Sequence, residues 1–109
     1  HVMRFNMDEC LEEYAAVARA FGVANAKLSA LENAEAAVAA VAALSIRVGT
    51  ARSIRAMGGN EGHIPELCDQ AMLDICMLTT PRMASRDDIA TIYRQALDDV
   101  KLYPANAKL

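Results

Sequence analysis

Hydrophobic residues return every three or four positions through most of the chain, and they fall into four long stretches. The stretches span residues 6–22, 29–49, 63–80 and 85–100. This spacing is typical of the buried face of an amphipathic helix. No segment alternates apolar and polar residues with a period of two. The pattern therefore predicts an all-α protein, a helical bundle of four main helices plus one short helix, without a β-sheet.

The helix boundaries carry recognisable end signals. In a capping box, the first side chain and an acidic side chain three residues later each bond the other's backbone. Three pairs have this spacing, namely Asn6 with Glu9, Ser29 with Glu32, and Ser85 with Asp88. Gly22 and Gly49 follow the first two helices, where glycine commonly ends a helix. We expect Thr50 to cap the short helix over residues 51–57, before a glycine-rich break at residues 58–62.

The third helix is expected to begin at Pro65 and to continue to about Leu78, because Pro81 keeps the residue before it out of the α conformation. Its apolar stripe consists of Ile64, Leu67, Cys68, Ala71, Met72, Ile75 and Cys76. Cys76 is therefore predicted on the buried face, about one turn from the end of the helix. Taken alone, the residues favour a packed core thiol there. A nucleophilic cysteine needs a nearby base, and neither histidine neighbours Cys76 in sequence.

Length and composition restrict the possible functions. The chain has 109 residues, the size of one ordinary domain. Its net charge of −3 gives little support for nucleic-acid binding. No apolar run reaches the roughly 18 residues that a membrane helix needs. Three cysteines without a CxxC pair favour reduced thiols and hence a cytoplasmic setting.

An abundance of alanine gives a core that buries little area per side chain and is weakly driven by the hydrophobic effect. We therefore expect these helices to be stabilised by packing against another subunit or another part of the same polypeptide. The chain begins with HVMRFN and has no initiator methionine. We interpret this beginning as the middle of a longer protein.

Candidate metal ligands are poorly placed. Cys68 and Cys76 lie eight residues apart, which on one helix is roughly 12 Å and too far to share an ion. His63 precedes Cys68 by five residues, a spacing that suits no single helix face, and the expected role of His63 is a solvated residue where the helix begins. A structural zinc site would need about four ligands in tight pairs. The chain alone is therefore not expected to hold a metal.

Other charged and polarisable groups have ordinary structural explanations. Three arginines, Arg52, Arg55 and Arg82, are candidates for anion binding. The simpler interpretation is that they lie on the surface and only contact solvent. The four methionines at positions 57, 72, 77 and 83 are expected to fill gaps in the core. The carboxylates near residues 8–13 complement the start of the first helix. These residues form no complete active site.

The order of the sequence landmarks is more specific than any single one. They read HVMRFN, EEYAAVARAFGV, a long helix ending in RVG, ARSIRAMGG, HIPELCDQAMLDIC, TPR and a helix that begins with DDI. In this order they resemble the C-terminal helical domain of the iron-containing alcohol dehydrogenases, up to about Leu97. The resemblance implies that residues 1–100 form the C-terminal domain of a two-domain fold like that of dehydroquinate synthase, with residues 101–109 as a tail.

The resemblance also implies cofactors. In that family an N-terminal α/β domain binds NAD(P), and a divalent iron lies between the domains, held by one aspartate and three histidines upstream of the part matched here. Fe²⁺ and NAD(P) would thus belong to the intact enzyme, and neither is expected to bind this chain alone. The metal would polarise the alcohol oxygen while hydride passes to or from the nicotinamide.

One residue role follows from the resemblance. Cys76 matches a family cysteine that lines the substrate cleft, and it is the single site residue carried over; no catalytic, cofactor-binding or metal-binding residue is implied. The sequence departs from the family pattern at Thr80, where asparagine is common before the proline. This departure concerns the shape of the loop that follows Cys76.

We therefore expect the chain to be part of an NAD(P) alcohol dehydrogenase that acts on a small alcohol or aldehyde. Alone it should be inactive, and it should pair with the N-terminal α/β domain in a homo-oligomer. One alternative is a free-standing helical module that buries an alanine-rich face against a partner protein. Another is a fragment of maleylacetate reductase, which runs related chemistry without needing the metal.

Overall fold

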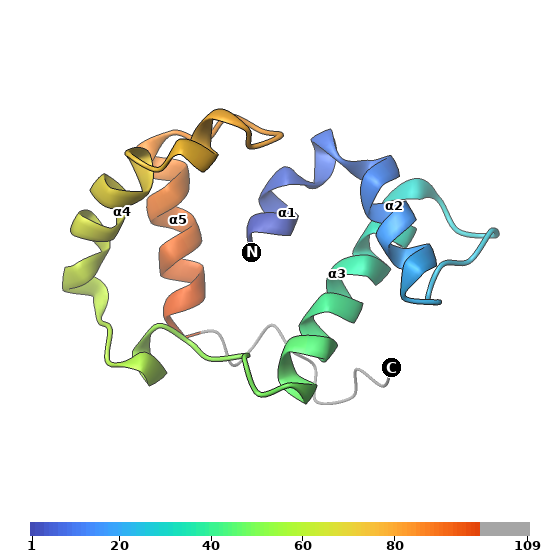
Figure 1. Cartoon of the computed structure of the whole chain (residues 1–109), viewed down its shortest axis with the longest axis horizontal. Coiled ribbons are helices and arrows are strands. Elements are labelled where there is room, and N and C mark those ends of the chain that lie inside the picture. Colours follow the sequence, from blue (N-terminus) through green and yellow to red (C-terminus); the bar gives the residue numbers. More distant parts are fainter. Residues whose placement is uncertain (99–109) are drawn as a thin grey trace. The chain divides into compact units, whose positions relative to one another are not determined.

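A computed structural model describes residues 1–98, which form helices joined by turns and loops, with no β-strand among them. This confirms the all-α prediction. The α-helices, shown in Figure 1, are α1 (Val2–Asn6), α2 (Leu11–Ala20), α3 (Ala30–Arg47), α4 (Ile64–Met72) and α5 (Arg86–Leu97). Short 3₁₀ turns are η1 (Met7–Glu9), η2 (Arg55–Met57), η3 (Glu61–His63) and η4 (Ile75–Leu78).

The described residues form two compact units. The first unit contains residues 1–6 and 52–98, and the second contains residues 7–51. Within the part of the chain that the structure describes, no helix is both long enough and apolar enough to cross a bilayer.

The second unit is built on α2 and α3, which pack side by side (Figure 1). The predicted capping box at the start of α3 is confirmed, because the Ser29 hydroxyl accepts from the Glu32 amide at 3.2 Å and the Ser29 amide donates to the Glu32 carboxylate at 2.8 Å. Gly49, just after α3, has a φ of +77°, which glycine adopts without strain. The buried alanines of this unit are Ala15, Ala18, Ala34, Ala37, Ala40 and Ala43.

The predicted start of the first long helix is wrong. Asn6 is the last residue of α1 and is buried, and the chain makes a 3₁₀ turn before α2 begins at Leu11. Met7 lies in that turn and is 5% exposed. Burying a methionine side chain is worth about 1.5–3 kcal/mol, whereas a helix cap contributes about 1 kcal/mol. The turn thus holds Met7 in a buried position, and α2 begins after it instead of at the Asn6–Glu9 pair.

The predicted short helix over residues 51–57 is also wrong, since only the 3₁₀ turn η2 forms there. The Thr50 hydroxyl donates to the Ser45 carbonyl at 3.3 Å and so helps to end α3 instead of starting a helix. Val48, which directly follows α3, is exposed and has a non-helical backbone conformation.

The first unit contains α4 and α5, which pack against each other. Ile64 and Cys68 of α4 are buried with Ala90 of α5. The capping box of α5 is confirmed, with the Ser85 hydroxyl accepting from the Asp88 amide at 3.1 Å and the Ser85 amide donating to the Asp88 carboxylate at 2.9 Å. The predicted extension of this helix to residue 100 and the tail at residues 101–109 lie outside the described residues.

The third predicted helix is shorter than expected. It ends at Met72, and Asp74 adopts an extended conformation that caps the separate turn η4. A short acidic side chain competes for nearby backbone amides and so favours a new turn over helix continuation. As a result Ile75, predicted on the buried stripe, is 76% exposed.

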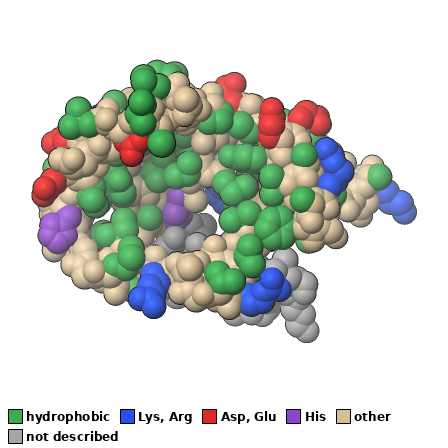
Figure 2. Space-filling model, viewed as in Figure 1, with side chains coloured by type: hydrophobic (Ala, Val, Ile, Leu, Met, Phe, Trp, Pro, Cys, Tyr) green, Lys and Arg blue, Asp and Glu red, His purple; other side chains and the backbone are tan. Residues whose placement is uncertain are grey.

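The segment from the end of α4 to the start of α5 has an apolar surface. Leu73, Ile75 and Leu78 are all at least 76% exposed, and Figure 2 shows hydrophobic side chains gathered over this part of the first unit. The expectation that the methionines fill the core is wrong for Met57, Met72 and Met83, which are exposed. Met77 alone of the four is half-buried.

Candidate functional site

A cavity of about 560 Å³ lies wholly within the first unit. Its walls come from α1, α4, the residues around η4, and α5. The lining residues are Val2, Phe5, Leu67, Gln70, Ala71, Asp74, Cys76, Met77, Thr80, Ala84, Ile89, Ile92 and Tyr93. Most of them are apolar, and the volume falls in the range of about 300–1,000 Å³ that small-molecule sites occupy.

Cys76 lines this cavity from η4 and is exposed. The prediction of a packed core thiol is therefore wrong, because α4 stops four residues before Cys76 and leaves it off the buried helical face. Cys68, on the same predicted stripe, is fully buried. The two cysteines thus have different environments despite their matching positions in the helical pattern.

Asp74 controls the local chemistry of Cys76. Its carboxylate accepts a hydrogen bond from the Cys76 amide at 2.8 Å, and this bond lowers the pKa of Asp74. In turn, a hydrogen bond to the Asp74 carboxylate and its negative charge raise the pKa of the Cys76 thiol. The thiolate is the reactive form of cysteine. Cys76 is therefore held as a neutral thiol at physiological pH and is not an activated nucleophile.

Helix α1 forms a wall of the cavity that sequence reasoning did not assign. Arg82 donates to the Phe5 carbonyl at 3.0 Å, and its guanidinium carbon lies 4.2 Å from the centre of the Phe5 ring. The Thr80 hydroxyl donates to the Asn6 side-chain oxygen at 3.5 Å. These contacts join residues more than 70 positions apart, so no local pattern in the sequence signals them.

A second cavity, of about 390 Å³, shares Leu67 and Gln70 of α4 with the first and is also lined by Ile54, Met57 and His63. His63 is exposed, and its Nδ1 accepts a hydrogen bond from the Asn60 amide at 3.2 Å. The expectation of a solvated histidine where the helix begins is confirmed. This hydrogen bond occupies one ring nitrogen of His63.

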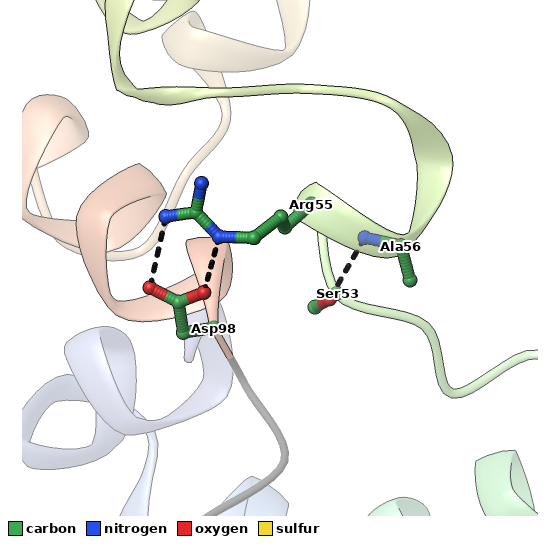
Figure 3. A network of polar contacts seen from close by, with 4 residues as sticks. All are labelled: Ser53, Arg55, Ala56 and Asp98. Atoms are coloured by element: carbon green, nitrogen blue, oxygen red, sulfur yellow. Dashed lines mark hydrogen bonds and ion pairs between the residues drawn. The ribbon is translucent and has the colours of Figure 1, made fainter.

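Two of the three arginines considered for anion binding are engaged within the protein. Arg55 pairs with Asp98 through two hydrogen bonds, and Figure 3 shows the guanidinium facing that carboxylate, next to the Ser53–Ala56 bond of the same turn. Arg82 is held by Phe5 as described above. Their partners leave neither arginine arranged as part of a dedicated anion site.

The residues present do not fit an iron site. Within residues 1–98, no three side chains of histidine, cysteine, aspartate or glutamate lie close enough to hold a metal ion. All three cysteines are free, with Cys10 and Cys68 buried and Cys76 exposed. No step of chemistry through a metal can therefore be assigned to these side chains.

Comparison with known proteins identifies relatives for almost the whole chain. The model of the Fe-containing alcohol dehydrogenase family, C-terminal, matches residues 1–97. Lactaldehyde reductase of Escherichia coli (strain K12) is 40% identical over 96 residues, which make up 88% of this chain and 25% of the relative. The 1,3-propanediol dehydrogenase of Klebsiella pneumoniae is 34% identical over 96 residues, with the same coverage. The NAD-dependent methanol dehydrogenase of Bacillus methanolicus is 33% identical over 97 residues, 89% of this chain and 26% of the relative.

The chain thus spans about a quarter of the length of these relatives. A comparison with solved structures found no match.

Proposed function

Because the chain belongs to the Fe-containing alcohol dehydrogenase family and matches its C-terminal part, we propose that it walls the substrate cleft of an NAD(P)-dependent alcohol dehydrogenase. The observation that carries this proposal is the position of Cys76. It is exposed in the wall of a mostly apolar cavity, and the resemblance to the family implies that it corresponds to a cysteine lining the substrate cleft. The substrate would be a small alcohol or aldehyde.

The contribution of this chain is to bind and orient the substrate and to exclude water from it. Apolar side chains such as Leu67 and Ile92 line the cavity and would surround the carbon chain of an alcohol. Cys76 offers a neutral, polarisable thiol in place of a charged group. Excluding water from such a site strengthens the electrostatic interactions of the reacting groups.

The cofactors would come from outside this chain. One relative is an NAD-dependent enzyme by name, and the family is named for iron. We assign both groups to the N-terminal α/β domain and its boundary with this chain, within a homo-oligomeric enzyme. The three free cysteines fit a reducing, cytoplasmic setting.

The test compares the 109-residue chain alone with a longer polypeptide in which the family's N-terminal domain precedes it. Both would be incubated with ferrous iron, NAD⁺ or NADP⁺ and a panel of primary alcohols, and reduced nicotinamide would be measured by its absorbance. We expect turnover by the longer protein, and no turnover or stoichiometric iron in the short chain. Iron-dependent turnover by the short chain would refute the proposal that the metal and the cofactor bind outside this chain. An inactive longer protein would refute the proposed alcohol dehydrogenase function.

The same assay tests the metal requirement. Loss of turnover after chelation, with recovery on adding iron, is the expected result. Full activity in the chelated protein would show that turnover does not need the metal, a property that the maleylacetate reductase alternative shares.

A second candidate is a helical interaction module, and the exposed apolar segment around Leu73 and Leu78 is the observation that favours it. The alanine-rich face that the sequence suggested for such a module is already buried, as Ala34 and Ala37 are fully inaccessible. A partner would therefore bind the segment around η4. The mass measured by light scattering separates the two candidates. A self-sufficient module should form a complex of defined mass through the segment around η4, and Leu78→Asp should abolish that complex.

A further inference from the structure

We propose that the apolar segment over residues 73–83 is the surface on which the preceding part of a longer polypeptide packs, with Ile75 and Leu78 at the centre of the contact. This inference rests on the proposed function, because it names the face that joins this chain to the rest of the enzyme and the chemistry of that contact. Neither Ile75 nor Leu78 lines a cavity, so the contact is distinct from the binding of a small molecule.

The first step is the exposure of the segment. Four of its large apolar side chains lie almost entirely in solvent, namely Leu73 (81% exposed), Ile75 (76%), Leu78 (80%) and Met83 (79%). The next most exposed large hydrophobic side chain among the described residues is that of Met57, at 65%. Single apolar side chains on a surface are ordinary, whereas several gathered in one segment mark a binding surface.

The second step is the geometry of the turn. Ile75 and Leu78 are the first and last residues of the 3₁₀ turn η4. Side chains three residues apart in such a turn project from the same side, so these two form one apolar ridge. Leu73 precedes the turn and Met83 follows it. Most of the binding energy of an interface comes from side chains near its centre, and we place Ile75 and Leu78 there.

The third step is the charge of the segment. Asp74 and Arg82 are its only acidic and basic residues, and both are engaged within the first unit. The Asp74 carboxylate accepts from the Cys76 amide at 2.8 Å, and Arg82 donates to the Phe5 carbonyl at 3.0 Å. An apolar surface depleted of available charge has the composition of the buried core of an interface. The surface that covers it should therefore be apolar, and the contact should depend little on salt.

The fourth step is the identity of that surface. The part matched here makes up 25% of lactaldehyde reductase and of 1,3-propanediol dehydrogenase, so about three quarters of each of those polypeptides lies outside it. A surface on the same polypeptide is present at an effective concentration that reaches about millimolar. It would therefore occupy the segment ahead of a separate protein at micromolar concentration.

The test is hydroxyl-radical footprinting, in which the labelling rate of a side chain follows its exposure to solvent. It compares the 109-residue chain with a longer polypeptide in which the family's N-terminal domain precedes it. Ile75 and Leu78 should be labelled about tenfold more slowly in the longer protein, because the centre of an interface excludes water. Met57, exposed outside the segment, is the internal control and should be labelled at a similar rate in both proteins.

A substitution at the centre of the segment separates the contact from the stability of the first unit. In the longer polypeptide, Leu78→Asp should lower the midpoint of urea unfolding and restore fast labelling of Ile75, because a charge is unfavourable in an apolar contact. In the 109-residue chain the same position is exposed, so the midpoint should not change. Leu78→Ala should show the same contrast at smaller size if the aspartate variant of the longer protein folds poorly. Met57→Asp is the matched control and should affect both proteins equally.

Protein concentration and salt identify what covers the segment. Slow labelling in the longer protein that persists on dilution and in molar salt is the expected result for an apolar contact within one polypeptide. Slow labelling that is lost on dilution would show that a second copy or a separate protein covers the segment, and would overturn the inference. Slow labelling that molar salt reverses would overturn its apolar chemistry.

The remaining outcomes separate this inference from the proposed function. Equal slowing at Met57 would overturn the assignment of the contact to this segment. Fast labelling of Ile75 and Leu78 in a longer protein that oxidises alcohols would overturn the inference and leave the proposed function standing. Slow labelling in a longer protein without dehydrogenase turnover would uphold the inference and reject the proposed function.

Discussion

The Asp74 carboxylate accepts a hydrogen bond from the amide of Cys76 at 2.8 Å, and this contact decides where the cysteine lies. Asp74 begins a new turn two residues after α4 ends. Cys76 is thereby carried off the helical face and into the wall of the cavity. One short acidic side chain thus sets the position of Cys76 and raises the pKa of its thiol.

The first prediction concerns that thiol. Asp74→Asn removes the negative charge that raises the pKa of Cys76. A lower pKa means more thiolate at a given pH, so alkylation of Cys76 near pH 8 should become several times faster. The rate is measured by mass spectrometry of the peptide that contains Cys76. Cys10 and Cys68 are buried and serve as internal controls that should stay slow. An unchanged or slower rate in the variant would show that Asp74 does not suppress the thiolate.

The position of Cys76 illustrates how much of this structure can be predicted from the sequence. Apolar spacing and capping pairs correctly predicted an all-α chain, the starts of α3 and α5, and the burial of Cys68 on α4. The same spacing extended α4 by about six residues too far, because periodicity does not register a side chain that captures a backbone amide. Pro81 was taken as the end signal for this helix, whereas Asp74 ends it earlier.

Local patterns in the sequence could not predict that α1 forms part of the cavity wall. Phe5 and Arg82 are 77 positions apart, and neither belongs to a pattern that points to the other. A long-range contact of this kind depends on how distant elements pack, which periodicity and propensity do not encode. Only the resemblance to a known family predicted that Cys76 lines a cleft, and it named neither Phe5 nor Arg82.

The two cysteines of the predicted stripe should respond differently to the same substitution. Cys68 is fully buried between α4 and α5, so Cys68→Ser places a hydroxyl among apolar groups and should cost about 1–3 kcal/mol. Cys76→Ser exchanges an exposed side chain and should change the free energy of unfolding by less than about 0.5 kcal/mol. Urea unfolding followed by circular dichroism gives both values. Equal losses at the two positions would contradict the assigned burial.

The turn that precedes α4 makes a further prediction about packing. A Cβ atom on Gly59 would clash with the Cγ2 atom of Ile54 and lie 3.0 Å from the Ile54 carbonyl oxygen. Gly59→Ala should therefore destabilise the first unit by about 1–3 kcal/mol through overpacking, as measured by urea unfolding. Gly62→Ala is the matched control, since its Cβ would meet only the Asn60 side chain, at 3.0 Å. It should cost less.

A double variant shows whether the clash is the cause. Ile54→Ala removes the Cγ2 atom, so Gly59→Ala should cost less in that background than in the wild type. The remaining cost reports the approach to the Ile54 carbonyl. Strictly additive losses would mean that the alanine methyl destabilises the turn by some route other than contact with Ile54.

The capping boxes predict how stability depends on pH. Hydrogen bonds from the Ser29 amide and hydroxyl lower the pKa of Glu32 from 4.5, and those from Ser85 lower the pKa of Asp88 from 3.8. A carboxyl group whose pKa is lower in the folded state than in the unfolded state stabilises the fold above the unfolded pKa. That stabilisation is lost as the pH falls from about 4.5 through the folded values, so the free energy of unfolding should decrease across this range.

Substitutions identify the groups responsible. Glu32→Gln and Asp88→Asn should each flatten part of the acid slope, measured by urea unfolding between pH 7 and pH 2. Ser29→Ala should cost about 1 kcal/mol at pH 7 and should remove the same part of the slope as Glu32→Gln. Combining the two should flatten the slope no further, because both act through one set of hydrogen bonds. A slope that survives intact in Ser29→Ala would show that the carboxylate of Glu32 is not stabilised by the cap.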